Sequence, residues 1–422
     1  MSWSSGRKAF RPVLASLGLL TAAAVAAAFG RGGPPPGEAA DTVDPEQVLR
    51  GRALVIEHAC GECHGGTRDP AAEGWLAGVN RPEQEFRIGP CAFEAGAEPC
   101  FITRPRNLTP DNTTGLGRFS ERQIFNALRY GLRPGETADV EITSGTPGVG
   151  NFPEHPKYLA PPMPWPAWRH MPDEDLRAIA AYLKHGVKPV SNRVADSDGP
   201  PDFWASAYTE EAIGSYPAAP FPTGNEVKPP AKMLAKVLRG RQVVLQHDCG
   251  ACHGGTHPEA EGWLGGITAP QQELWFGPCF MDPDAEPCFR TRPRNLTPDQ
   301  ATGTGGYSER QIFNALRYGL KPSETPDVEI PSHGASTFPE NPRYLAPTMP
   351  WGSWRYMSEE DLWAVAAYLK HGVKPVSNEV QESDAPPDNW ASESTPEKVG
   401  PYPPPAFPTA NEVAVRMADG EQ

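Results

Sequence analysis

Two segments of the chain place a pair of thiols and an imidazole at one fixed spacing. The sequence C-x-x-C-H occurs at residues 60–64 and again at residues 249–253, and this spacing is the attachment signature of c-type haem. Two thiols three positions apart on the first turn of a helix can reach both vinyl groups along one porphyrin edge, and the following imidazole then points at the iron. We therefore predict two covalently bound haem c groups, each held by two thiols, with a histidine as the proximal iron ligand: Cys60, Cys63 and His64, and Cys249, Cys252 and His253.

Three other chemistries could use the same cysteines. A thioredoxin-like dithiol needs a βαβ context, which the sequence does not predict, and has no use for the histidine. A zinc site built from the two thiols of the first motif with Cys91 and Cys100 has acceptable ligand types but leaves His64 unexplained. A disulfide between Cys60 and Cys63 would be strained. The two matched copies of the motif favour haem over all three.

A haem iron also needs a sixth ligand or an open position. Met163 and Met349 lie in matched loops, Ala-Pro-Pro-Met-Pro-Trp and Ala-Pro-Thr-Met-Pro-Trp, whose prolines lower the entropy cost of holding a thioether on iron. We expect these two residues to be the distal iron ligands; the alternative is that they only fill gaps in the core. Three other matched pairs are poorer candidates. Met171 and Met357 adjoin a helix start, His58 and His247 precede the first motif cysteine, and His185 and His371 end the last helix.

The chain repeats itself over nearly two hundred residues. CGECHGGT at residue 60 returns as CGACHGGT at residue 249, and ERQIFNALRYGL at residue 121 returns unchanged at residue 309. AAYLKHGVKPVSN at residue 180 returns at residue 366, so the offset drifts by only three residues along the unit. Such regularity indicates a duplicated domain and not a solenoid of short repeats. We expect one domain at residues 35–227 and a second at residues 228–422.

Each repeat contains the same three helical patterns. Residues 45–59 run directly into the first motif, residues 120–132 open with a Ser-x-x-Gln capping box, and residues 173–185 place apolar side chains on one face. No alternating run is long enough to predict a sheet. The 51 prolines and 42 glycines indicate long loops. We therefore expect an all-α fold of two tandem domains with long Pro- and Gly-rich loops.

The first 34 residues have the composition of an export segment. Basic residues precede residues 13–29, which are uncharged and mostly apolar and end in small residues suited to cleavage. We expect a signal peptide or an N-terminal membrane anchor at residues 1–34, a buried core helix being the alternative. The protein would then be periplasmic, either soluble or attached to the inner membrane. The net charge of −14 argues against a nucleic-acid partner.

These motifs together resemble class I cytochrome c domains. The resemblance rests on Gly51, nine residues before Cys60, on C-x-x-C-H, on a Met-Pro pair, and on the pattern Asp-x-Asp-Leu-x-Ala-Ile-x-Ala-Tyr-Leu. It covers residues 45–190 and 235–376, so the resemblance implies tandem cytochrome c domains. It also implies His–Met ligation, with Met163 and Met349 on the first and second haem.

Two further segments resemble a narrower group. Asn107-Leu108-Thr109-Pro110-Asp111 and Met163-Pro164-Trp165 resemble the haem subunits of periplasmic dehydrogenases of alcohols, aldehydes or sugar acids. The chain departs from that group in two ways. Many such subunits carry three C-x-x-C-H motifs, whereas this chain has two, and the 99 residues from His64 to Met163 exceed those of a minimal domain.

The long interval holds an extra cysteine pair in each repeat. Because an exported protein can keep disulfides, we expect the bonds Cys91–Cys100 and Cys279–Cys288, with a redox-active dithiol as the alternative. Four arginines that follow could bind haem propionates or remain solvated: Arg104, Arg106, Arg292 and Arg294. Four tryptophans could form the distal haem wall or belong to the ordinary core: Trp165, Trp168, Trp351 and Trp354. We interpret the N-x-T triplets at Asn107 and Asn112 as turn chemistry.

Three functions compete on these grounds. An electron-transfer protein would carry electrons from a dehydrogenase to a respiratory acceptor, a cytochrome or an oxidase, and would itself catalyse no reaction. A dihaem peroxidase needs one haem with an open distal position, but both repeats keep the same Met-Pro-Trp. A zinc or dithiol module leaves the histidines and methionines unexplained. The sequence favours the electron carrier.

Overall fold

A computed structural model describes residues 43–80, 85–92, 96–199, 204–269, 273–277, 279, 284–386 and 390–415. We refer to its residues up to 227 as the first half and to those from 228 as the second half. The predicted signal or anchor at residues 1–34 lies outside the described residues. Within the described ranges, no helix combines the length and apolar character needed to cross a membrane.

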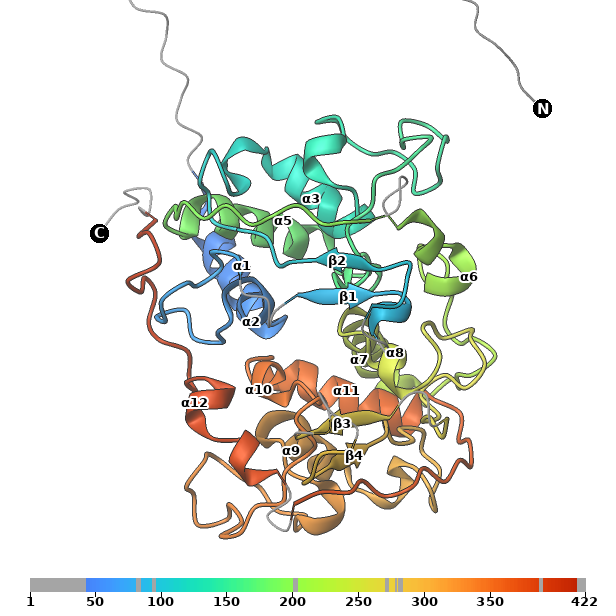
Figure 1. Cartoon of the computed structure of the whole chain (residues 1–422). Helices are drawn as coiled ribbons and strands as arrows, with labels where there is room; N and C mark the ends of the chain where they lie inside the picture. Colours follow the sequence, from blue (N-terminus) through green and yellow to red (C-terminus); the bar gives the residue numbers. More distant parts are fainter. Residues whose placement is uncertain are drawn as a thin grey trace, which may run out of the picture. The chain divides into compact units, whose positions relative to one another are not determined.

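The described chain is rich in helices, which confirms the coarse expectation of a helical fold. The main helices recur in the same order in both halves. In the first half these are α1 (Pro45–Glu57), α2 (Cys60–Gly65), α3 (Glu121–Tyr130), α4 (Trp165–Trp168) and α5 (Asp173–Ala181), with a short α6 (Glu210–Ile213). In the second half they are α7 (Leu234–Gln246), α8 (Cys249–His253), α9 (Glu309–Tyr318), α10 (Trp351–Trp354) and α11 (Glu359–His371), with a short α12 (Pro396–Val399) (Figure 1).

Local sequence explains where the helices begin and end. Ser120 and Gln123 form the predicted capping box, in which each side chain bonds the other residue's backbone N–H, and Gly131 ends α3 in the left-handed conformation. Asp44 caps α1 by accepting from the N–H of Glu46. The second-half helix α9 has the same box at Ser308.

Each half has its core where its first and last helices cross. α1 packs on α5 and α7 packs on α11, and a Cβ at Gly51 would overlap the carbonyl oxygen of Ala178. Gly240 makes the matching approach to Ala364. Fully buried apolar side chains surround each crossing, among them Val48, Leu54 and Leu176 in the first half. The glycine allows the helices to approach closely, and this holds the motif that follows α1 against the core.

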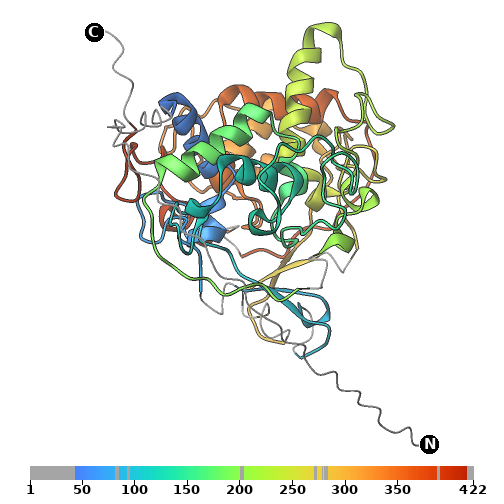
Figure 2. The ribbon, with the colours of Figure 1, turned by 90° about the horizontal axis from the view of Figure 1, so that it is seen from above.

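Two short antiparallel hairpins were not expected from the sequence. β1 (Phe86–Ile88) pairs with β2 (Phe101–Thr103), and β3 (Leu274–Phe276) pairs with β4 (Phe289–Thr291). Figures 1 and 2 show β1 and β2 adjacent from two directions. Strands of three residues are too short to reveal an alternating pattern, so the prediction of no sheet missed them.

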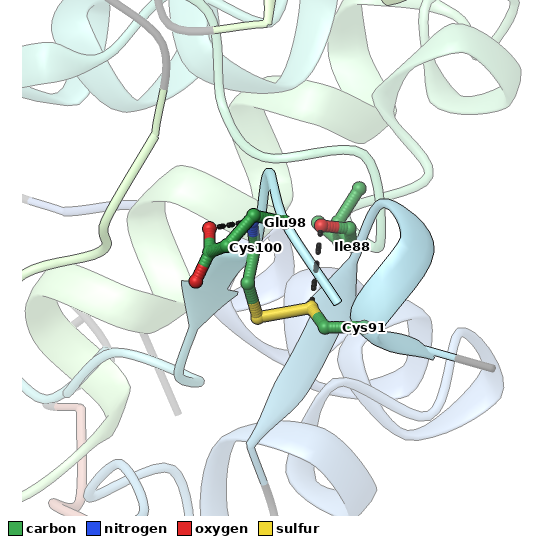
Figure 3. Close-up of a disulfide and its surroundings, with 4 residues drawn as sticks. All are labelled: Ile88, Cys91, Glu98 and Cys100. Atoms are coloured by element: carbon green, nitrogen blue, oxygen red, sulfur yellow. Dashed lines mark hydrogen bonds between the residues drawn. A yellow bond between two sulfur atoms is a disulfide. The ribbon is translucent and has the colours of Figure 1, made fainter. Parts of the chain in front are cut away.

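A disulfide spans the turn of each hairpin. Cys91 bonds Cys100 and Cys279 bonds Cys288, with Cα–Cα distances of 5.3 Å in both. Figure 3 shows the first bond, with the N–H of Cys100 donating to the Glu98 carboxylate at 2.9 Å. The predicted pairing is confirmed. Because Cys91 and Cys100 are bonded to each other, they are not available as zinc ligands.

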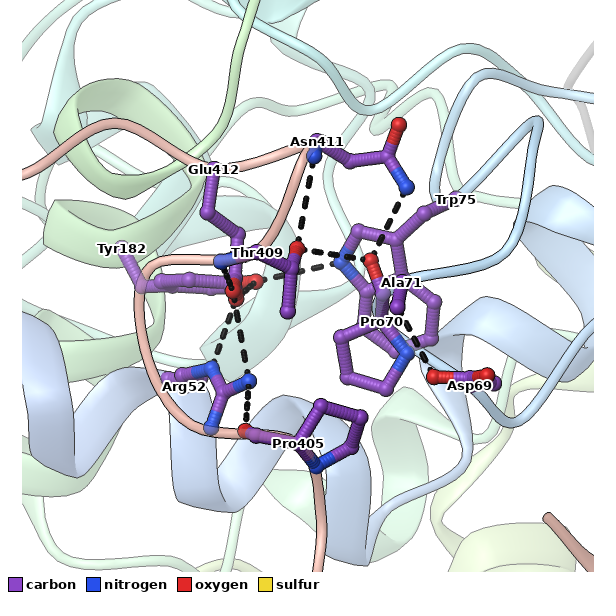
Figure 4. A network of polar contacts seen from close by, with 10 residues as sticks. All are labelled: Arg52, Asp69, Pro70, Ala71, Trp75, Tyr182, Pro405, Thr409, Asn411 and Glu412. Atoms are coloured by element: carbon purple, nitrogen blue, oxygen red, sulfur yellow. Dashed lines mark hydrogen bonds and ion pairs between the residues drawn. The ribbon is translucent and has the colours of Figure 1, made fainter. Parts of the chain in front are cut away.

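Each half is completed by a segment from the other. The sequence Phe-Pro-Thr-x-Asn-Glu-Val occurs at residues 221–227 and 407–413, and we call these segments the tail motifs. Glu412 of the second tail motif bonds Arg52 of α1 at 2.6 Å and accepts from the Tyr182 hydroxyl at 2.6 Å (Figure 4). Glu226 of the first tail motif makes the same contacts with Arg241 and Tyr368 in the second half.

Candidate haem-binding sites

Both C-x-x-C-H motifs form a new helix directly after the first helix of their half. Two residues separate the two helices, and the second of them is in the left-handed conformation: Ala59, with φ 55°, before α2 and Asp248, with φ 54°, before α8. This sharp turn places Cys60 at the first position of α2 and His64 on its last turn. Cys60 and Cys249 are half-buried free thiols, and Cys63 and Cys252 are exposed free thiols.

Burial keeps the inner thiols protonated. It raises the pKa of Cys60 and of Cys249 to about 12 in each case. A reactive dithiol needs a thiolate. The surroundings of these cysteines therefore disfavour a redox-active dithiol.

The two motif histidines are oriented by the backbone. Nδ1 of His64 donates to the carbonyl oxygen of Arg106 at 2.6 Å, and Nδ1 of His253 donates to that of Arg294 at 2.7 Å. Burial lowers the pKa of both imidazoles and keeps them neutral. A neutral imidazole whose Nδ1 carries the proton presents the lone pair of Nε2, which is how proteins orient histidine ligands of metals.

An indole ring packs closely against the glycine of each C-x-x-C-H motif. A Cβ at Gly61 would overlap the ring of Trp75, and Gly250 has the same relation to Trp263. Nε1 of Trp75 donates to the Tyr182 hydroxyl at 3.1 Å, which in turn donates to Glu412. Figure 4 shows this chain of contacts around the tail motif. The glycine of each motif is thus required by packing, and the tail motif supports the C-x-x-C-H helix indirectly.

The predicted distal methionines border the same clusters as the motif cysteines. Met163 and Cys60 are both partly buried against the first-half core, and Met349 and Cys249 have the same relation to the second-half core. Met163 lies in a tight turn, because its N–H donates to the carbonyl of Ala160 at 2.9 Å. By contrast, Met171 and Met357 are only 2% and 3% exposed inside the cores, where they act as packing residues.

An asparagine that the sequence analysis treated as turn chemistry organises the loop behind each histidine. Asn107 is buried, donates to the carbonyl of Val190 at 2.7 Å, and accepts from the N–H of Thr109 at 2.9 Å. Asn295 makes the same bonds in the second half. Because Asn107 adjoins Arg106, it fixes the carbonyl that orients His64. The unchanged repetition of Asn-Leu-Thr-Pro-Asp was the signal that could have revealed this role.

The four arginines of this region bind carboxylates of the protein itself. Arg104 pairs with Glu85 and Arg106 with Asp196, with nitrogen–oxygen distances of 2.5 and 2.6 Å. Arg292 and Arg294 pair with Glu273 and Glu382. The four tryptophans are all buried in the cores: Trp165, Trp168, Trp351 and Trp354.

These observations fit a covalently bound haem in each half. Cys60, Cys63 and His64 would hold one group and Cys249, Cys252 and His253 the other, because the four thiols are free and the tautomer of each histidine is fixed for binding iron. When bound, the haem supplies an iron that exchanges one electron. The protein residues supply attachment, orientation and exclusion of water.

Comparison with known proteins supports the same conclusion. No family model matches the chain. The chain is 28% identical over 325 residues to the gluconate 2-dehydrogenase cytochrome c subunit of Pantoea cypripedii, which covers 72% of this chain and 62% of that protein. Several relatives of this chain are named as cytochrome subunits of gluconate, alcohol and fructose dehydrogenases. This confirms the resemblance found in the motifs.

Two further relatives bear related names. The cytochrome c subunit of alcohol dehydrogenase (quinone) of Komagataeibacter europaeus is 27% identical over 265 residues, covering 63% of this chain and 46% of that protein. The fructose dehydrogenase cytochrome subunit of Gluconobacter japonicus is 25% identical over 274 residues, covering 64% of this chain and 45% of that protein. The chain thus spans about half of the length of these two relatives.

Proposed function

We propose that the chain is a dihaem cytochrome c that carries electrons from a dehydrogenase to a respiratory acceptor and catalyses no reaction itself. The observation that carries this proposal is the histidine geometry. Each C-x-x-C-H helix ends in a neutral imidazole whose Nδ1 is bonded to a backbone carbonyl, so that Nε2 is left for iron. This arrangement occurs in both halves, on matched residues.

Iron ligation by His64 with Met163, and by His253 with Met349, suits a carrier. A thioether ligand would raise the reduction potential and would fill the place where a peroxidase binds its substrate. The tandem domains that we propose at residues 35–227 and 228–422 would each hold one haem, with a tail motif exchanged between them.

The partners are proposed from charge and from the relatives. A net charge of −14 steers the protein toward a basic face on a partner. The relatives are named as subunits of gluconate, alcohol and fructose dehydrogenases, so we propose a dehydrogenase as the donor and a cytochrome or oxidase as the acceptor. We place the protein in the periplasm, soluble or anchored through residues 1–34.

The number of haems tests this function directly. Intact-mass spectrometry of the protein made in a host with haem attachment machinery should show the mass of two haems, and the double variant Cys60→Ala/Cys63→Ala should show one. The matched double variant Cys249→Ala/Cys252→Ala should also show one. A wild type without haem, or with stoichiometric zinc in its place, would contradict the proposal.

A further inference from the structure

Two histidines outside the proposed iron sites join the halves through their rings. His58 follows α1 and His247 follows α7, and their imidazoles stack with centroids 4.3 Å apart and planes within 5°. Among the aromatic rings of the described residues, this is the one contact that connects the two halves. The sequence predicts no role for either histidine.

The stack continues into an indole on each side. Trp168 of α4 meets His58 edge to face at 6.1 Å, and Trp354 of α10 meets His247 in the same way at 6.0 Å. We call the series Trp168, His58, His247 and Trp354 the ring series. Its outer members are buried in the two cores, so the series runs from one core to the other.

In each half, two members of the ring series, a histidine and a tryptophan, lie close along the chain to residues of the proposed haem site. His58 precedes Cys60 by two residues and His247 precedes Cys249 by two. Each tryptophan follows the proposed methionine ligand of its half by five residues and belongs to the short helix that this methionine loop begins. Each end of the series is therefore close along the chain to an attachment cysteine and to a distal loop.

The two imidazoles of the ring series are uncharged. Desolvation lowers the pKa of both His58 and His247 to about 3, and the charged groups that face them, Glu57, Arg50, Arg239 and Asp361, do not offset it. Nε2 of His247 lies 3.1 Å from the Glu57 carboxylate, while Nε2 of His58 is buried without a partner. Both rings remain neutral near neutral pH.

A metal ion shared by this cluster does not fit the ring geometry. The ligand atoms of Glu57, His58 and His247 lie within 4.8 Å of one another. However, a histidine binds a metal in the plane of its ring at about 2.0–2.1 Å. Two parallel rings stacked face to face place any shared ion far out of both planes. The cluster is a ring contact and not a ligand set.

We propose that the ring series is the route by which electrons pass between the two haems, an inference that rests on the proposed function. Electron tunnelling decays less steeply through covalent bonds and van der Waals contacts than across solvent. In each transfer one ferrous iron becomes ferric and the other ferric iron becomes ferrous. No bond forms or breaks, and no proton moves, because the imidazoles stay neutral.

The test measures the rate of electron exchange between the two haems in the full-length, half-reduced holoprotein. Magnetisation transfer between haem methyl signals in NMR reports the rate directly, without any substrate turnover. His58→Leu removes the ring and should slow the exchange roughly tenfold. His58→Phe keeps a ring and should retain most of the rate. His247→Leu removes the ring of the second half and should slow the electron exchange by a similar factor. His185→Leu, which alters a histidine paired with Glu121 on the surface, is the matched control and should leave the rate unchanged.

The outcomes separate this proposal from the proposed function. Two haems by intact mass together with an unchanged exchange rate in His58→Leu and His247→Leu would overturn the route alone. A loss in His58→Phe as large as that in His58→Leu would also overturn it, because the ring would then not be what is needed. Fewer than two haems in the wild type would overturn the proposed function and the route with it.

Discussion

The two halves share their order of elements but differ in the residues directly before their C-x-x-C-H motifs. Glu57-His58-Ala59 precedes Cys60, whereas Gln246-His247-Asp248 precedes Cys249. Glu57 contacts His247 across the junction, while the amide oxygen of Gln246 and Nε2 of His58 are both buried without a partner. Nearly identical scaffolds therefore surround their proposed haems with different charges, and a carrier with two unequal potentials is the expected result.

The largest effect should come from the tail motifs, because each supports the opposite half. Glu412→Ala leaves the guanidinium of Arg52 buried without its carboxylate partner, with only the carbonyl of Pro405 still accepting from it, and should lower the free energy of unfolding by about 3–5 kcal/mol. Glu226→Ala should cost a similar amount in the second half. Hydrogen exchange should then accelerate in α1 and α5 for the first variant and in α7 and α11 for the second.

Lys398→Ala is the control for these variants. It removes a pair with Glu393 in which both side chains are exposed, and such pairs contribute about 0–1 kcal/mol. If Glu412→Ala accelerated hydrogen exchange only in α7 and α11, the packing of each tail motif on the opposite half would be wrong.

The next effect separates the two methionines of each half. Met163→Ala should remove about half of the near-infrared charge-transfer band of an oxidised His–Met cytochrome and lower one of the two potentials, since a thioether raises the potential. Met171→Ala should leave the band unchanged and cost about 2–5 kcal/mol of stability, because it creates a cavity in the core. Absorption spectra, a redox titration and denaturant unfolding measure the three quantities. A band lost in Met171→Ala and kept in Met163→Ala would reverse the ligand assignment.

The smallest effect concerns Asp248, which lies directly before Cys249 at the position that Ala59 holds in the first half. Burial raises the pKa of the Asp248 carboxyl from 3.8 to about 6. The folded protein therefore holds this proton more tightly than the unfolded chain. The stability that Asp248 contributes is full below pH 3.8 and is lost as the pH rises through about 6.

Asp248→Ala, which copies Ala59 of the first half, should consequently be more stable than the wild type above pH 6 and should flatten the pH profile of unfolding. In the holoprotein, the carboxylate formed near pH 6 favours the ferric state, so only one of the two potentials should fall as the pH rises through this range. A redox titration at several pH values checks this. Two potentials that fall together in the wild type would remove the proposed difference between the halves.

Features encoded locally could be predicted from the sequence. The capping box at Ser120 and the apolar spacing that follows specify α3 within one turn of chain, and the two cysteines of each hairpin lie near enough to pair without knowledge of the fold. The five residues of the C-x-x-C-H motif are enough to predict haem attachment. These predictions needed no information about distant segments.

Features that depend on distant segments could not be predicted. The bond between Arg52 and Glu412 joins residues 360 positions apart, and nothing near either residue indicates its partner. The stack of His58 on His247 depends on how two helix ends meet, so position in the sequence suggested only that neither histidine reaches a distal haem face. The role of Asn107 depends on Val190, which lies 83 residues further along the chain, after α5.

The exchange of tail motifs gives the two halves different histories during synthesis. The second half receives its supporting segment, residues 221–227, before its own helices have been made. The first half has its C-x-x-C-H motif by residue 64 but receives Glu412 only after the helices of the second half have been translated. The half that is made first is therefore the last to be completed, and in the proposed cytochrome its cysteines would be left without the support of the tail motif for longer than those of the second half.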